Sequence, residues 1–231
     1  MTYRIVDKLL DNPVYFALLT GDAHRGSGSS HVKFFDEQIS PFAGFEEGYS
    51  RGFDELYELL PPHRNILYAT RRQINEPKGW KLIQHIAGLQ FILSALKSVD
   101  VKVAELIPLQ KQHVQQMVGL AKLTKPGPFD IRTIEFGHYF GIFDNDKLVA
   151  MTGQRLHVAH YTEISAVCTH PEYSDKGYAG VLLAHQLHLV INNGQVPFLH
   201  VRSDNERAIA LYERFGFKEN GEMNFYFLKK E

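Results

Sequence analysis

One strand–turn–helix segment constrains the fold of this chain more than any other part of the sequence. A β run over residues 162–169 is followed by Pro171, a turn rich in small residues, and a strongly apolar helix over residues 177–191. Proline ends the strand because it lacks a backbone N–H, and the first amides of the helix have no partners within it. Gly177 and Gly180 have no Cβ, so a ligand can approach the main chain closely there. The turn is therefore expected to bind a phosphate or pyrophosphate.

The turn has an alternative interpretation, in which Gly177 and Gly180 only ease the change of chain direction and bind no ligand. A second segment of the sequence helps to decide between the two. Residues 203–206 read Ser-Asp-Asn-Glu, a capping-box pattern that starts a helix. Gly216 suits the left-handed position that follows a last helical turn. Tyr212 lies toward the Ile209 side of this helix, where it either reaches a cleft or packs half-buried against the core.

Together, the two segments resemble the GNAT superfamily of acyl-CoA-dependent N-acyltransferases. The resemblance rests on His-Pro-Glu-Tyr-x-x-Lys-Gly-Tyr-Ala at residues 170–179 and Asn-x-x-Ala-Ile-x-Leu-Tyr-Glu-x-Phe-Gly-Phe at residues 205–217. It covers residues 101–231. It implies an α/β fold with a mixed, central, mostly antiparallel sheet flanked by helices, preceded here by a smaller α/β region.

The resemblance also implies roles for particular residues. Tyr212 would protonate the leaving thiolate, and Asn205 would contact the cofactor. Acyl-CoA would lie beside the strand that ends at Val167, Cys168 and Thr169. Its pyrophosphate would lie on the loop formed by Asp175, Lys176, Gly177, Tyr178, Ala179 and Gly180. The loop departs from the family pattern at Ser174-Asp175, where Arg-Gly is common. The carboxylate of Asp175 weakens pyrophosphate binding unless it turns outward or caps the helix.

A base is expected as well, because acyl transfer needs a neutral amine and a lysine-like amine has a pKa of ~10.4. Glu163 matches the base position of the histone-acetylating members of the superfamily. His200 lies five residues before Asn205, where the ribosomal-protein-acetylating branch carries a glutamate. We rank Glu163 first and His200 second. The alternatives are a solvated carboxylate at a strand end and a histidine whose ring is already satisfied.

Composition excludes several other classes of protein. A formal net charge of −1 and a pI near 6.9 argue against a broad nucleic-acid surface. Cys168 is the only cysteine, which excludes an internal disulfide or a cysteine zinc cluster, and we expect it to be inert packing. Histidine pairs at 157/160 and 185/188 lack the His-Glu-x-x-His pattern, so no metal is expected.

The ends and apolar runs of the sequence favour a cytoplasmic protein with no membrane partner. The first residues lack the apolar region of a secretory signal. No apolar run approaches the ~20 residues that a membrane-spanning helix needs.

The first hundred residues carry no motif that names a function. Apolar patterning predicts strands at residues 14–19, 31–35 and 66–69, a loop at 21–30, and helices at 53–60 and 80–96. The pattern restarts near residue 100, which divides the chain into an N-terminal α/β region, 1–100, and an acetyltransferase domain, 101–231. Residues 1–100 are interpreted as a degenerate copy of the same unit.

Patterning in the second half extends the strand–turn–helix segment on both sides. It predicts a strand at 101–107, a helix along 114–121, a hairpin of 136–143 with 148–156, a strand at 196–201, a helix at 203–215 and a β run at 217–228.

The expected function is transfer of an acetyl or similar acyl group from acetyl-CoA to a primary amine, by direct attack in a ternary complex and without a metal. The acceptor amine is left open, as either a small molecule or a peptide. The alternative is an acyl-CoA-binding or sensing protein without turnover.

Overall fold

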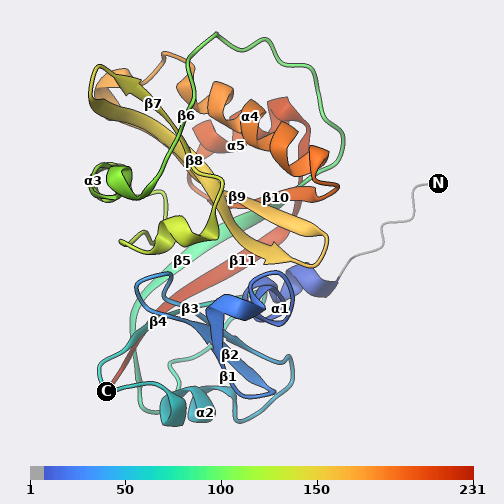
Figure 1. The fold of residues 1–231 in the computed structure, drawn as a ribbon. Helices are drawn as coiled ribbons and strands as arrows, with labels where there is room; N and C mark the ends of the chain where they lie inside the picture. The colour runs from blue at the N-terminus through green and yellow to red at the C-terminus, as the bar shows by residue number, and fades with distance from the viewer. Residues whose placement is uncertain (1–7) are drawn as a thin grey trace, which may run out of the picture.

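A single mixed sheet forms the frame of the molecule (Figure 1). The structure is a computed structural model that describes residues 8–231. Its eleven strands lie in the order β1-β2-β3-β4-β11-β5-β10-β9-β8-β7-β6. Neighbouring strands are antiparallel except β3 with β4 and β9 with β10. The expected α/β fold with a mostly antiparallel sheet is therefore confirmed.

The strands are β1 (Gly26–Gly28), β2 (Val32–Phe35), β3 (Phe42–Phe45), β4 (Asn65–Thr70), β5 (Trp80–Leu93), β6 (Ile107–Pro108), β7 (Phe140–Asp144), β8 (Lys147–Val158), β9 (Tyr161–Thr169), β10 (Val196–Arg202) and β11 (Phe217–Lys230). The α-helices are α1 (Pro13–Leu19), α2 (Gly52–Leu59), α3 (Val114–Thr124), α4 (Tyr178–Asn192) and α5 (Glu206–Phe215). Short 3₁₀ turns are η1 (Lys8–Asp11), η2 (Ala23–Arg25), η3 (Lys111–His113), η4 (Thr133–Phe136) and η5 (Pro171–Tyr173).

Helices cover both faces of the central strands. On β10, Phe198 belongs to the apolar cluster that includes α1 and α3, whereas the next residue, Leu199, belongs to the cluster of α4 and α5. Successive residues of a strand point to opposite faces of its sheet. The two helix pairs therefore lie on opposite sides of β10, and each buries its own apolar cluster.

Two expected elements in the first half have the opposite secondary structure. Most of the helix expected at residues 80–96 is strand β5, which ends at Leu93, because this strand is flanked by β11 and β10 and has apolar residues on both faces. Apolar positions on both faces also satisfy a helical pattern. Residues 14–19 form helix α1 instead of a strand. The signal was Pro13 at the first helical position, since a short apolar run alone does not distinguish the two structures.

Residues 101–107 were expected to form a strand, but only Ile107 is in one. The preceding residues run as a loop in which Val101 packs against the cluster of α4 and α5. The expected loop at 21–30 contains η2 and the short β1. Helix α2 ends before Pro61, as predicted, and the elements expected from residue 114 onward are confirmed within a few residues of their bounds.

Strand β5 comes from the first hundred residues and lies between β11 and β10, which come from the last hundred. The two halves of the sequence thus share one sheet. The division of the chain at residue 100 stays a prediction.

Candidate active site

Strands β9 and β10 separate near the middle of the sheet. They pair in parallel only from Tyr161 with Val196 to Glu163 with Phe198, although β9 continues to Thr169. Beyond Glu163, the β9 edge that faces β10 has no partner strand among the described residues. Such an edge presents main-chain donors and acceptors to any ligand that lies between the two strands.

A β-bulge lies in this open part of β9. Its partner strand β8 pairs Gly153 with Ser165 and Met151 with Cys168, so β9 has one extra residue between these pairs. Ala166, within the bulge, has φ 53°, which is the left-handed region. Bulges turn the main chain locally and often lie beside active sites. This one places Val167 on the lining of two neighbouring clefts.

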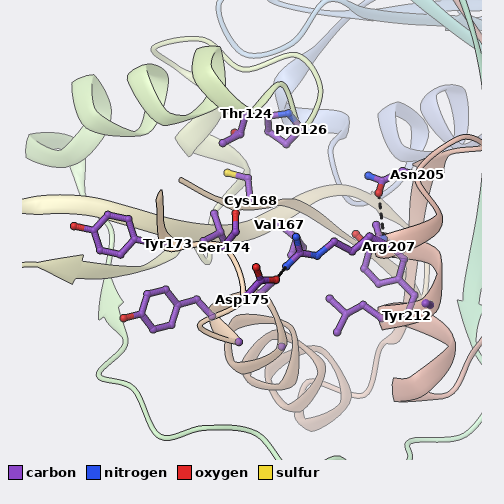
Figure 2. Close-up of a pocket in the computed structure, with 18 of the residues that line it drawn as sticks. Thr124, Pro126, Val167, Cys168, Tyr173, Ser174, Asp175, Asn205, Arg207 and Tyr212 are labelled. Atoms are coloured by element: carbon purple, nitrogen blue, oxygen red, sulfur yellow. Dashed lines mark hydrogen bonds and ion pairs between the residues drawn. The ribbon is translucent and has the colours of Figure 1, made fainter. Parts of the chain in front are cut away.

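The first cleft, of about 640 Å³, lies between β9, the start of α4, and α5 (Figure 2). Nearly all the residues expected to bind the cofactor line it: Val167, Cys168, Thr169, Asp175, Gly177, Tyr178, Ala179, Gly180 and Asn205. Lys176 is the exception, because its ammonium group lies over the Tyr173 ring, 4.5 Å from the centroid.

The loop before α4 forms a nest of main-chain donors. Asp175 and Gly177 both have positive φ, at 65° and 82°, and alternation of this kind makes successive amides converge. Within the described chain, the amides of residues 175–179 have no hydrogen-bond partner, whereas those of Gly180 and Val181 bond to the Gly177 carbonyl. The expected anion site at this turn therefore has free donors and the positive end of a 15-residue helix.

Three cations around this nest were not expected from the sequence. Arg207 and Arg214 line the first cleft from α5, seven residues apart, a spacing that places them on one helix face. Lys102 approaches from the loop before β6, and a methyl group on Gly177 would lie 3.6 Å from its Cδ. The arginine spacing could have been read from the sequence, but the approach of Lys102 depends on how its loop crosses α4.

Asp175, the departure from the family pattern, turns toward α5. Its Oδ1 accepts a hydrogen bond from Arg207 Nη2 at 2.6 Å, and Figure 2 shows this pair across the cleft. The carboxylate is thus neutralised by a neighbouring guanidinium, although both side chains are largely exposed. An exposed pair of this kind contributes little to stability and opens easily.

Tyr212 and Asn205 lie where the first cleft meets the second. Asn205 caps α5, with Oδ1 accepting from the Ala208 amide at 3.1 Å. Tyr212 is 7% exposed, and its hydroxyl has no hydrogen-bond partner among the described residues. Burial raises the pKa of Tyr212 to about 12, and Cys168 adds to the shift. The hydroxyl therefore keeps its proton at neutral pH and can donate it.

The second cleft, of about 720 Å³, opens on the other side of this junction. It is bounded by β9, β10, β11 and the segment that follows α3. The two clefts share six lining residues: Lys125, Pro126, Val167, Asn205, Ala208 and Tyr212. Two molecules that enter from opposite sides would therefore meet at the bulge and the tyrosine.

Glu163, expected as the first candidate base, lies beneath the second cleft. It is fully buried and accepts hydrogen bonds from Arg155 Nε at 2.7 Å, Arg155 Nη2 at 2.6 Å and His200 Nδ1 at 2.7 Å. Burial alone would raise the pKa of Glu163, but the charge and hydrogen bonds of Arg155 outweigh it, with His200 adding to them, so the pKa falls well below its usual range. The carboxylate has little affinity for a proton, and this argues against contact with the amine.

His200 has partners at both ring nitrogens. Gln90 Oε1 accepts from Arg71 and Asn220, so the Gln90 amide NH₂ donates to His200 Nε2 at 2.9 Å. The ring therefore carries its proton on Nδ1, which donates it to Glu163. This arrangement matches the alternative of a satisfied histidine, because both ring nitrogens are engaged in hydrogen bonds.

Neither histidine pair forms a cluster with other ligands. His157 Nδ1 lies 2.9 Å from the buried carboxylate of Asp22, and His185 packs edge-on against Phe140. Within residues 8–231, no three His, Cys, Asp or Glu side chains come together in a way that could hold a metal ion. None of the helices in this part of the chain is long and apolar enough to cross a membrane.

Comparison with known proteins shows the family of this chain. A putative acetyltransferase of the GNAT family from Novosphingobium aromaticivorans is 30% identical, and the match covers 97% of this chain and 100% of that one, with a TM-score of 0.89. The chain therefore belongs to the GNAT family. The family model described as FR47-like protein also matches, over residues 139–226.

More distant structures share the fold. A GCN5-related N-acetyltransferase from Kribbella flavida has a TM-score of 0.63 at 13% identity, covering 96% of this chain and 95% of that one. A Drosophila protein has the same TM-score at 14% identity, covering 100% of this chain and 90% of the other. A search of curated proteins finds no match.

Proposed function

We propose that this protein transfers an acyl group, acetyl in the simplest case, from acyl-CoA to a primary amine held in the second cleft. The observation that carries the proposal is the junction of two clefts at Val167 and Tyr212, with a nest of free amides at the far end of the first. Membership of the GNAT family supports the same chemistry.

The residues of the first cleft fit a coenzyme A thioester. The diphosphate would lie on the amides of residues 175–179, with Arg207 and Arg214 close by. The open edge of β9, from Val167 to Thr169, would bond the amide groups of the pantetheine arm. The bound thioester supplies an activated acyl carbon, to which the amine nitrogen bonds as the carbon–sulfur bond breaks and a proton passes, overall, from nitrogen to sulfur.

Two groups of this chain would act on that step directly. The main chain at the bulge would donate a hydrogen bond to the acyl oxygen, where negative charge develops. Tyr212 would hold a proton at the junction of the clefts and give it to the departing sulfur. A thiol has a pKa of ~8.5, so a proton donor speeds this departure without being essential to it.

Glu163 and His200 are proposed to position groups of the second cleft. Each is buried and hydrogen-bonded in a way that removes its proton-accepting site from the amine. The amine proton would then leave to solvent through the open cleft. The same observation favours a second candidate function, binding of acyl-CoA without turnover, because no free base faces the junction among the described residues.

Two measurements on one preparation separate these functions. Thermal unfolding with CoA and with acetyl-CoA tests binding, and a ligand at 100 times its Kd should stabilise the fold by ~2.7 kcal/mol. Release of free CoA from acetyl-CoA, with a panel of amines, tests transfer. Binding with amine-dependent release supports the transferase. Binding with no release from any amine supports the sensor, and no binding overturns both.

A further inference from the structure

The acidic and basic residues that line the second cleft are all of one sign. Among the described residues that line it, none is Asp or Glu, and four are Lys or Arg: Lys122, Lys125, Arg155 and Arg202. Arg202 is paired with Asp204 through two hydrogen bonds at the exposed end of β10. Lys122 and Lys125 have no carboxylate partner in the described part of the chain. A polyamine or any other polycation would meet repulsion in such a cleft and no counter-charge.

Arg155 is the most constrained of these cations. Its side chain is 10% exposed, and two of its three guanidinium nitrogens, Nε and Nη2, are held by Glu163. The guanidinium also lies over the Phe42 ring, 4.9 Å from the centroid. A residue fixed in this way has already lost the rotamer freedom that ligand binding would otherwise cost.

The third nitrogen, Nη1, is left for a ligand. Within the described residues it has no hydrogen-bond partner, and it is not sealed from solvent as the buried, unpartnered polar atoms of the chain are. Arg155 lines the second cleft, and Nη1 would lie 3.5 Å from a methyl group placed on Gly127. A guanidinium N–H₂ group of this kind binds carboxylate or phosphate oxygens well.

The rest of the cleft wall is largely apolar and aromatic. Phe42, Phe129, Phe225 and Phe227 line it, together with Ile86 and Leu67. Rings and aliphatic groups of this number favour a ligand that buries an apolar body. The cleft therefore combines an apolar wall, a fixed cation and two unpaired lysines, and it ends at the junction with the first cleft.

We propose that the acceptor is an amine that carries its own carboxylate and an apolar side chain, as a hydrophobic amino acid does. The carboxylate lies on Arg155 Nη1, the apolar group lies among the phenylalanine rings, and the amine points to the junction beside Tyr212. Glu163 is a positioning residue that fixes the orientation of the Arg155 guanidinium. The assignment rests on the proposed acyl transfer, since it names the acceptor of that reaction.

Binding of the reaction product tests the assignment without requiring turnover. With the enzyme saturated with CoA, calorimetry compares N-acetyl-L-phenylalanine with the neutral N-acetyl-L-phenylalaninamide and the cationic N-acetylspermidine. We expect the acid to bind at least tenfold more tightly than either. Equal binding of acid and amide, tighter binding of either other probe, or no binding of the acid at millimolar concentration would each overturn the proposal.

Paired substitutions connect the preference to Arg155. The double variant Arg155→Met/Glu163→Leu removes both members of the buried pair, which avoids an uncompensated charge, and it should lose the preference for the acid. The matched control Arg202→Gln/Asp204→Asn removes a two-bond pair at the cleft rim and should keep the preference. A preference that survives in the first variant, or is lost in both, contradicts the assignment.

Turnover then separates failure of the assignment from failure of the proposed function. CoA release with phenylalaninamide and phenethylamine at rates equal to phenylalanine would overturn the acceptor class while leaving the transferase standing. Arg155-dependent binding of the acid, with no CoA release from any amine, would support the acceptor site and overturn transfer.

Discussion

Arg155 and Glu163 meet side by side beneath the second cleft, through Nε–Oε2 at 2.7 Å and Nη2–Oε1 at 2.6 Å. The carboxylate is completely buried, and the Arg155 side chain, which lines the cleft, is only 10% exposed. A buried pair leaves a large uncompensated charge if one partner is removed. Replacing either residue should therefore both destabilise the centre of the sheet and alter the wall of the second cleft.

Glu163→Gln should lower the free energy of unfolding by about 3 kcal/mol at neutral pH, because Arg155 would keep its charge in a buried place. Urea unfolding measures the loss. The control Glu222→Gln removes an exposed carboxylate whose side chain has no partner among the described residues, and it should change stability by less than about 0.5 kcal/mol. A loss of similar size in both variants would contradict the buried pairing.

The same variant predicts a pH dependence. Because the pKa of Glu163 is lowered in the folded state, its ionised form stabilises the fold above the unfolded pKa of ~4.3, and this contribution is lost as the pH falls below that value. The difference between wild type and Glu163→Gln should thus be constant above about pH 5 and shrink by about 1.4 kcal/mol per pH unit below about pH 4. If the stability difference between wild type and Glu163→Gln grew as the pH fell, the pKa of Glu163 would be raised in the folded state instead of lowered.

Gly216→Ala should destabilise the end of α5 strongly. Gly216 has φ 99°, and a methyl group there would lie 1.8 Å from the Ala95 carbonyl oxygen, which is main chain and cannot rotate away. The left-handed conformation costs about 1–2 kcal/mol for a residue with a side chain, and the clash adds about 1–3 kcal/mol.

Gly194→Ala is the matched control for this substitution. Gly194 also has positive φ, at 71°, but a methyl group there meets no atom within 4 Å. Gly194→Ala should therefore lower the stability only by the cost of the left-handed conformation. Thermal unfolding of the two variants side by side compares them, and equal losses would show that the Ala95 contact does not matter.

The residues proposed from the sequence to bind the cofactor lie in two continuous segments, and all but Lys176 line the first cleft. Local patterns place Gly177 at the start of a helix and Tyr212 within another, and neither depends on distant pairing. Strand β5 was mistaken for a helix because a central strand with apolar residues on both faces has no clean alternation.

The network below the second cleft could not be read from the sequence in the same way. Arg155 meets Glu163 because β8 pairs with β9 in the register that sets Gln154 opposite Ile164. This register changes before His157, and such irregularities leave little trace in residue patterns. Gln90 faces His200 only because β5 lies beside β10. Judging whether Glu163 can act as a base therefore requires knowledge of its partners, which come from two other strands, β8 and β10.

Tyr212→Phe should lower kcat by roughly tenfold or more, as expected for loss of a general acid, with little change in the Kd of acetyl-CoA. Stability should not fall, because the hydroxyl has no partner to lose among the described residues. Tyr57→Phe is the control, since Tyr57 lines neither cleft and bonds only the terminal carbonyl of Glu231 through its hydroxyl. Unchanged kcat in Tyr212→Phe would show that Tyr212 only packs against its neighbours and donates no proton.

With a pKa of about 12, Tyr212 should stay protonated across the pH range of an acyl-transfer assay. The rate should therefore show no decline from loss of this acid up to about pH 10, the ordinary pKa of a tyrosine. A tyrosine-dependent decline near pH 8, absent in Tyr212→Phe, would contradict the environment that the structure gives this side chain.

Asp175 and Arg207 predict opposite effects on coenzyme binding. Asp175→Asn removes a negative charge from the lining of the first cleft and frees Arg207, so it should tighten CoA binding by about 2–5-fold, the effect of about 0.5–1 kcal/mol for a mostly exposed charge. Arg207→Gln should weaken binding by a similar factor. Calorimetry at low and high salt measures both effects, which should shrink at high salt because exposed charges are screened. Weaker binding in Asp175→Asn would mean that the carboxylate supports the loop conformation instead of opposing the diphosphate.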